Sequence, residues 1–328
     1  MVGAFLPNEV DFAAFLTVNF FSEPVLVLAE DFVVLAIKIK RFFAQKIKFK
    51  FRYFNWFAKK YLFFCEILME TLFIGRNCIR LSETESTNTY AINLLKEVNV
   101  PDGTLIITKH QTNGRGQRGT KWLAEPGENI TCSLVIHPKF LSLNEHFLIS
   151  KIIALSIQKT IQDFLVTDKS DVKIKWPNDI MVKELKISGI LIENSIQDYR
   201  IKNSVIGFGI NVNQSSFGEL NNIATSIFCL NKKISNCDEI INLICSYFES
   251  YYLKLKQKKY NSINEEYLNN LLHFNDLFQY QENDTGNLLS GKITNVENNG
   301  WVNIETLPDL EIKKYSLKEI TFLKTLTT

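Results

Sequence analysis

The hydrophobic residues after position 69 fall into short runs and periodic stretches that predict both strands and helices. Helical spacing over 87–95 follows Ser86 or Thr87, either of which suits an N-cap, and a second helical stripe covers 144–165. Strands outnumber these helices and alternate with them irregularly, which favours an α+β fold class over a doubly wound one. The expected strands occupy residues 72–74, 79–81, 104–108, 130–136, 172–175, 187–192 and 204–210.

The amino-acid composition and pattern of the C-terminal part of the chain change twice. Residues 237–272 are rich in Leu, Ile, Tyr and Lys, which predicts a helical stretch with a solvated polar face. Two strand-like runs, 288–296 and 301–305, then flank a turn at Asn298–Gly300. We therefore expect a main domain over residues 69–280 and a small β domain over 281–328.

Residues 1–68 differ in composition from the rest. Fourteen of the 25 phenylalanines lie before Cys65, and 38–60 is basic and aromatic with no acidic residue. Glu30 and Asp31 interrupt the longest apolar run, which is too short for a transmembrane helix, and no signal-peptide pattern is present. An amphipathic membrane-surface helix over 42–64 stays open. We favour a start codon assigned too far upstream, because Met69 begins a segment of ordinary composition.

Composition excludes several classes of protein. Hydrophobic residues make up 46% and charged residues 22% of the chain, near globular averages, and the net charge of +2 indicates no polyanionic partner. The six cysteines include no Cys-x-x-Cys pair, and the four histidines form no ligand cluster with them, so we expect no metal site. This cysteine usage is typical of a reducing compartment and predicts a cytoplasmic protein.

A glycine-rich loop at 114–119, with the sequence Gly-Arg-Gly-Gln-Arg-Gly, follows the predicted strand 104–108. Three glycines allow a turn whose N–H groups converge on an anion, and Arg115 and Arg118 add positive charge. An ordinary polar loop explains the pattern equally well at this stage. The loop lacks the Gly-Lys-Ser/Thr of a phosphate-binding Walker loop and the following helix of a dinucleotide fingerprint.

Three further clusters carry polar residues next to apolar strands. In Lys-Trp-Pro-Asn-Asp at 175–179, proline restricts the backbone and presents Asn178 and Asp179 at a strand end, although a solvated turn is the alternative. Lys186 precedes an apolar strand, either as an edge gatekeeper or as a cation at a pocket mouth. Glycines at 207 and 209 then precede Asn211, whose amide suits a nucleobase edge.

Together and in this order, these features resemble the successive motifs of biotin protein ligases. The similarity covers residues 73–213, from Ser-Thr-Asn at 86–88 through Gly-Arg-Gly, with Lys121 and Trp122 after it, to Gly-Phe-Gly-Ile-Asn-Val at 207–212. It extends weakly over the C-terminal region. The resemblance implies a mixed-sheet catalytic domain of the biotin/lipoate ligase type, followed by a small SH3-like β-barrel.

The resemblance also implies an activity: ATP-dependent conversion of biotin to biotinyl-5′-adenylate, then transfer to a lysine of a carrier protein. Lys186, Arg115 and Asp179 would be catalytic, with Lys186 bridging the biotin carboxylate and the α-phosphate and Asp179 deprotonating or orienting the incoming lysine. The biotin-binding residues would be Ser86, Thr87, Asn88, Gln111, Gly114, Arg115, Gly116, Gln117 and Lys186. The ATP-binding residues would be Arg115, Arg118, Lys121, Trp122, Asn178 and Asn211.

The implied substrates are biotin and ATP, the latter with Mg²⁺, and the implied partner is the biotin carboxyl carrier protein of acetyl-CoA carboxylase. A homodimer stays open. Some members of the family carry an N-terminal repressor domain, but residues 1–68 have no helix-turn-helix pattern, so we expect no specific DNA binding. Many members carry a basic residue where this chain has Gln117. This departure bears on how tightly the adenylate is held.

Two alternatives remain at the level of sequence. A lipoate or octanoate ligase of the same superfamily would carry a different glycine-rich motif and lack Lys-Trp-Pro-Asn-Asp. A non-enzymatic protein could bind nucleic acid or a membrane surface through residues 38–60, with an inactive ligase domain. The presence of Arg115, Asp179 and Lys186 argues against the second alternative.

Overall fold

The computed structural model describes residues 71–166, 171–317 and 319–323, apart from the side chain of Arg118. The expectations for residues 1–68 lie outside this part of the chain. Among the described helices, none is both long enough and apolar enough to cross a lipid bilayer.

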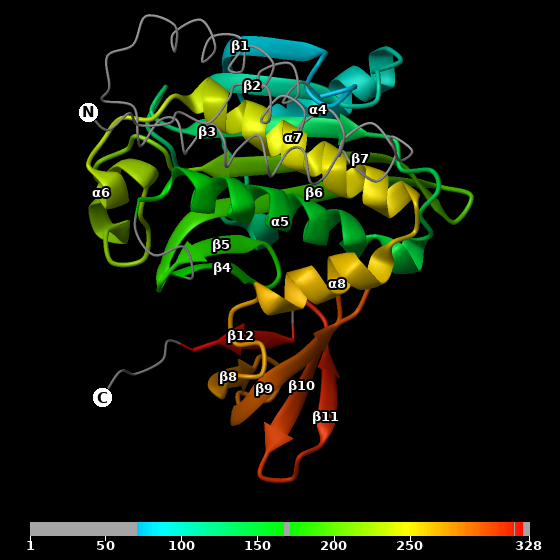
Figure 1. The fold of residues 1–328 in the computed structure, drawn as a ribbon, viewed down its shortest axis with the longest axis vertical. Helices are drawn as coiled ribbons and strands as arrows, with labels where there is room; N and C mark the ends of the chain where they lie inside the picture. The colour runs from blue at the N-terminus through cyan, green and yellow to red at the C-terminus, as the bar shows by residue number, and fades with distance from the viewer. Residues whose placement is uncertain (1–70, 167–170, 318, 324–328) are drawn as a thin grey trace, which may run out of the picture. The chain divides into compact units, whose positions relative to one another are not determined.

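The core of the structure is a seven-stranded mixed sheet with the strand order β1-β2-β3-β7-β6-β5-β4 (Figure 1). β1 and β2 are parallel, whereas every other neighbouring pair is antiparallel. The expected α+β class with a mixed sheet is therefore confirmed. The strands are β1 (Cys78–Thr84), β2 (Thr104–Gln111), β3 (Ile130–Ile136), β4 (Val172–Lys175), β5 (Asp179–Val182), β6 (Leu185–Gln197) and β7 (Arg200–Ile210).

Helices cover both faces of this sheet, so its central strands are buried on both sides. α5 (Phe147–Phe164), α7 (Cys237–Lys256) and α8 (Tyr260–Asn269) pack with one face in the main hydrophobic core. α4 (Thr87–Glu97) covers part of the other face, over a smaller cluster that includes Val135 and Val205. Every residue of β3 is buried as a result. The short helix α6 (Ile227–Asn231) follows β7.

Two local expectations were wrong. Residues 72–74 do not form a strand, because the backbone N–H groups of Leu72, Phe73 and Ile74 all donate to the buried carboxylate of Glu249, at 2.6–3.0 Å, in place of a strand partner. The expected helical stretch 237–272 is two helices. It breaks between α7 and α8, where Lys258 adopts a left-handed backbone conformation with φ of 58°.

The C-terminal region forms a second, antiparallel sheet with the order β11-β10-β9-β8-β12. The expected strands at 288–296 and 301–305 are present, and Gly300 lies in the turn between them with φ of 91°. β11 and β12 are the outer strands and do not pair within the described residues, so this sheet is open there. Its strands are β8 (Phe278–Glu282), β9 (Leu288–Val296), β10 (Val302–Leu307), β11 (Ile312–Tyr315) and β12 (Ile320–Phe322).

A buried lysine joins helix α5 to the C-terminal sheet. Lys151 of α5 is fully buried, and its ammonium donates to the Val296 carbonyl at 2.6 Å and to Asn264 Oδ1 at 2.8 Å. It also lies 5.5 Å from the centre of the Tyr267 ring. Burial lowers the pKa of Lys151 from 10.5 to about 7, although Glu297 acts in the opposite direction. The contact between helix layer and C-terminal sheet is therefore sensitive to pH.

This pKa predicts how stability changes with pH. Between about pH 7 and 10.5 the unfolded chain binds a proton at Lys151 that the folded chain lacks, so the free energy of unfolding rises with pH in that window. The contribution is at most ~1.4 kcal/mol per pH unit. Lys151→Met should flatten the rise measured by urea denaturation at about pH 7.5 and 9. If the free energy of unfolding rises equally with pH in both proteins, the lowered pKa of Lys151 is contradicted.

Candidate functional site

A cavity of about 350 Å³ lies on the face of the sheet that carries α4. Its floor exists because the strands place small residues side by side there. Gly209 of β7 pairs with Gly189 of β6 and with Thr131 of β3, and Gly207 pairs with Leu191 and Ser133. A Cβ atom at Gly207 would overlap the Asn88 side chain, and one at Gly209 would overlap the Trp122 indole. The glycines therefore admit these two side chains against the backbone of the sheet.

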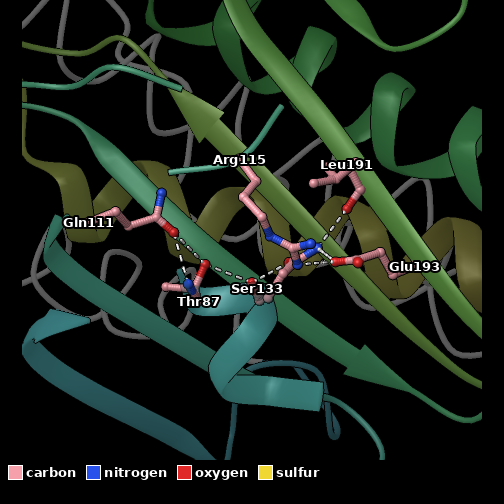
Figure 2. A network of polar contacts seen from close by, with 7 residues as sticks. Thr87, Gln111, Arg115, Ser133, Leu191 and Glu193 are labelled. Atoms are coloured by element: carbon pink, nitrogen blue, oxygen red, sulfur yellow. Dashed lines mark hydrogen bonds and ion pairs between the residues drawn. The ribbon is translucent and has the colours of Figure 1, made fainter. Parts of the chain in front are cut away.

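A network of polar groups, uncharged except for Arg115 and Glu193, occupies the α4 end of the floor (Figure 2). Gln111 Oε1 accepts from the Thr87 backbone N–H at 2.8 Å and from its hydroxyl at 3.2 Å. The Ser133 hydroxyl lies 2.7 Å from Thr87 Oγ1 and 2.6 Å from Asn88 Oδ1. Ser86, at the N-cap position of α4, is buried beside them and makes no side-chain cap bond. These groups can recognise a neutral ligand that both donates and accepts hydrogen bonds.

The loop 114–122 folds back on itself beside the floor. The Gly116 N–H donates to the Thr120 carbonyl at 2.7 Å, and the Trp122 N–H donates to the Gly114 carbonyl at 3.0 Å. Arg115 and Lys121 form an isolated antiparallel bridge between these bonds. Arg115 Nη2 reaches Glu193 Oε2 on β6 at 2.8 Å. The loop thus brings cationic side chains to the cavity on a short, hydrogen-bonded hairpin.

Lys186 and Asp179 meet at the other end of the floor. Lys186 Nζ lies 2.7 Å from Asp179 Oδ1, and both side chains are partly exposed. Asp179 Oδ1 is enclosed, and among the described residues its polar contact is with Lys186, an ion pair whose angles are not those of a hydrogen bond. Lys186 Nζ also lies 5.9 Å from the Trp122 ring centre, and the buried Trp122 Nε1 has no hydrogen-bond partner in the described part of the chain. The lysine can contact an anion in the cavity from this position.

The structure brings most of the expected residues together and leaves others apart. Lining the cavity are Ser86, Thr87, Asn88, Gln111, Arg115, Gly116, Gln117, Lys121, Trp122, Asn178, Asp179 and Lys186. Gly114 packs closely against the Trp122 carbonyl and the Gln111 side chain. Asn211 does not line the cavity: it is buried, and its side chain donates to the Thr225 carbonyl at 3.0 Å. The Arg118 side chain lies outside the described part of the chain.

Several groups at the site were not predicted. Ser133 joins Thr87 to Asn88, and Glu193 binds both Asn88 and Arg115. Ser133 is one of two polar residues in a mostly apolar strand, and Glu193 directly follows an apolar run. These were the features of the sequence that could have indicated the two residues. Four residues from the C-terminal region also line the cavity, namely Leu317, Ile320, Thr321 and Phe322. Trp176 contacts this region through its Nε1, which donates to the Gly300 carbonyl at 3.2 Å.

The charges of the cavity are unbalanced. Arg115 and Lys186 are paired with carboxylates, whereas Lys121 and Lys175 also line the cavity and have no ion pair among the described residues. The cavity therefore combines neutral polar groups beside α4 with a lining in which cationic side chains outnumber carboxylates. Such a site suits a ligand with a neutral hydrogen-bonding head and an anionic tail or phosphate groups.

Gly209 provides a test of the cavity floor. Gly209→Ala should expel the Trp122 indole, because the added methyl group would occupy the same space. The fluorescence emission of Trp122 is then expected to shift to longer wavelength as the ring becomes hydrated. The same substitution in a Trp122→Phe background should leave the emission spectrum unchanged. A spectrum unaffected by Gly209→Ala alone would show that the ring does not lie on this glycine.

Comparisons with known proteins find a similarity over the part of the chain that contains most of this site. The model of the biotin/lipoate A/B protein ligase family matches residues 81–211. A bifunctional ligase/repressor BirA of Bacillus spizizenii is 33% identical over 162 residues, which are 48% of each chain. A biotin–[acetyl-CoA-carboxylase] ligase of Mycobacterium tuberculosis is 28% identical over 150 residues, 46% of this chain and 54% of its own. The chain thus spans about half the length of the curated relatives it matches.

Solved structures extend the similarity beyond the matched domain. The biotin protein ligase of Aquifex aeolicus in complex with biotin and ATP superposes with a TM-score of 0.63 and 25% sequence identity. The match covers 76% of the present chain and 100% of that protein. The family match, these relatives and the fold together assign residues 81–211 of the chain to a domain of the biotin/lipoate A/B protein ligase family.

Proposed function

We propose that the chain activates biotin with ATP to biotinyl-5′-adenylate and then transfers the biotin to a lysine of a biotin carboxyl carrier protein. The observation that carries this proposal is the presence, in one cavity, of neutral polar groups beside α4 and an excess of cationic side chains over carboxylates. The ureido ring of biotin is neutral and both donates and accepts hydrogen bonds, whereas its carboxylate and the phosphates of ATP are anionic. One cavity of this kind can hold both substrates in reacting order.

In the first step a carboxylate oxygen of biotin attacks the α-phosphorus of ATP, and pyrophosphate leaves. Thr87, Asn88 and Gln111 would hold the ureido ring. Lys186 would lie between the two anions, offset their repulsion and stabilise the charge that develops on the phosphate. Arg115 and Lys121 would bind phosphate oxygens. Because the Lys186 ammonium is already fixed beside Asp179 and Trp122, it needs little reorganisation during the reaction.

In the second step the carrier lysine attacks the acyl carbon of the adenylate, and AMP leaves. The amine must lose a proton during this step. Asp179 lines the cavity next to Lys186, so its carboxylate would accept that proton or orient the amine. The adenine contact of Asn211 stays a prediction, and it would require the amide to exchange its bond to Thr225 for one to the base.

The side chains available as metal ligands indicate how Mg²⁺ would be held. Within the described residues, no group of three His, Cys, Asp or Glu side chains could hold a metal ion, and Asp179 is the one carboxylate that lines the cavity. This set fits Mg²⁺ that is held mainly by ATP phosphates and water. The carrier of acetyl-CoA carboxylase, a cytoplasmic location and the absence of specific DNA binding complete the proposal, and a homodimer stays open.

The first step can be tested alone. Exchange of labelled pyrophosphate into ATP should depend on biotin and should not respond to lipoate or octanoate. Exchange that lipoate supports and biotin does not would replace the proposal with a lipoate ligase. The absence of exchange with either acid would exclude adenylate formation.

A further inference from the structure

The turn 176–178 joins β4 to β5 and brings Asp179 to the cavity. Lys175 and Asp179 are paired across it, as the last residue of β4 and the first residue of β5. Because the turn is so short, the backbone of Asp179 cannot move independently of it. Asp179 therefore stays beside Lys186 only while the turn keeps its place on the sheet.

One end of the turn is bonded to β6. The Asn178 carbonyl accepts from the Ile190 N–H at 2.9 Å, and Asn178 Nδ2 donates to the Ile190 carbonyl at 2.8 Å. These bonds extend the pairing of β5 with β6, in which Asp179 lies opposite Gly189. The Ile190 N–H thus reports whether the turn lies on the sheet.

The other end of the turn is bonded to the C-terminal sheet through Trp176. Its indole Nε1 donates to the Gly300 carbonyl at 3.2 Å, and its ring meets the Phe322 ring edge to face, with 6.0 Å between the ring centres. Trp176 is only 2% exposed, so its indole offers a ligand almost no surface even though the residue lines the cavity. An effect of Trp176 on the reaction would therefore pass through the turn.

The Gly300 carbonyl is itself held by the helix layer. The turn between β9 and β10 lies on α5, where the Phe147 N–H donates to the Asn298 carbonyl at 2.9 Å. Lys151 of the same helix donates to the Val296 carbonyl at 2.6 Å. A Cβ atom at Gly300 would overlap the Phe147 ring, so the glycine permits this close approach. The acceptor of the indole N–H is thus fixed to the main domain.

We propose that Trp176 is a positioning residue: through its bond to the Gly300 carbonyl, the C-terminal sheet fixes the turn 176–178 and so holds Asp179 beside Lys186. An indole suits this role because its ring is rigid and its one N–H donor sets the direction of the contact. What Asp179 is held for, the loss of a proton by the carrier lysine, rests on the proposed function. The dependence of the turn on Trp176 does not.

The test compares two substitutions in the full chain, each of which removes one indole N–H. Trp176→Phe keeps an aromatic ring beside Phe322 but deletes the donor to Gly300. Trp301→Phe is the matched control, because Trp301 is the next residue of the same turn, is exposed and does not line the cavity. Without substrates, hydrogen exchange at the Ile190 amide should be about fivefold faster in Trp176→Phe, the effect of losing one hydrogen bond. It should be unchanged in Trp301→Phe.

Two outcomes of this experiment would overturn the proposal. One is equal exchange at Ile190 in the wild type and both variants. The other is acceleration by the same factor at the amide of Leu134, which lies in β3 and is separated from β5 by β7 and β6. That result would mean that Trp176→Phe lowers stability in general and does not act on the turn.

A double-variant cycle tests the same role in the reaction. Transfer of biotin from preformed adenylate should slow about fivefold in Trp176→Phe, but the same substitution should have almost no further effect in an Asp179→Asn background, since both act on one carboxylate. Equal slowing in both backgrounds would show that Trp176 acts independently of Asp179, against the proposal. If the wild-type chain forms no adenylate, the proposed function fails, and exchange at Ile190 still decides whether Trp176 holds the turn.

Discussion

Replacement of Lys186 by alanine is expected to slow biotinyl-adenylate formation by ~10²-fold, because loss of one preorganised group that stabilises transition-state charge costs ~3 kcal/mol. Lys186 Nζ is fixed 2.7 Å from Asp179 and close to the Trp122 ring, at the cationic end of the cavity. The measurement is the single-turnover rate of pyrophosphate release. The binding of biotin alone should change much less, since its ureido contacts lie at the other end of the floor.

Lys183→Ala is the matched control for this experiment. Lys183 precedes β6 by two residues, is exposed, and pairs at 3.7 Å with Asp171, away from the cavity. Its removal should leave the rate of adenylate formation unchanged. Pyrophosphate release by Lys186→Ala at nearly the wild-type rate would remove Lys186 from the chemistry of the first step.

Replacement of Asp179 by asparagine is expected to act on the second step. The amide keeps the shape of the side chain but cannot accept a proton, so transfer from preformed adenylate to the carrier lysine should slow by ~10²-fold. Adenylate formation should slow less, because Lys186 retains its charge. Transfer is measured with adenylate bound to the enzyme and carrier in excess, over a range of pH.

The control for Asp179 is Asp171→Asn, which removes the carboxylate of the exposed Lys183 pair in the same part of the chain. It should transfer biotin at the wild-type rate. If Asp179→Asn slows both steps equally, the carboxylate acts by holding Lys186 in place, and its role as a base for the carrier lysine is wrong.

Local patterns in the sequence were sufficient for much of the fold. The strand β3 was expected with its observed bounds, since five of its seven residues are apolar. The break between α7 and α8 was not foreseen, because Lys258 is neither glycine nor proline and its left-handed backbone has no local signal. The failed strand at 72–74 depends on Glu249, which lies about half the chain away in sequence.

The residues of the candidate site also fall into those that local sequence patterns predict and those that they do not. Arg115 and Lys186 each belong to a short sequence motif, so their place at the site could be predicted from their neighbours in sequence. Ser133 and Glu193 could not, because they enter the site through the register of β3, β7 and β6, which places Ser133 opposite Gly207 and Glu193 opposite Val205. Asn211 follows the end of β7, where its amide turns toward the Thr225 carbonyl and away from the cavity. These positions depend on contacts between residues far apart in sequence, and the local periodicity of the sequence does not predict such contacts.

The most direct test of the proposed activity is transfer of labelled biotin by the purified full-length chain to a biotin carboxyl carrier domain in the presence of Mg²⁺ and ATP. The account predicts label on one carrier lysine, dependent on ATP, absent when that lysine is replaced by arginine, and strongly reduced for Lys186→Ala. No transfer to a carrier domain that a known biotin protein ligase labels under the same conditions would contradict it.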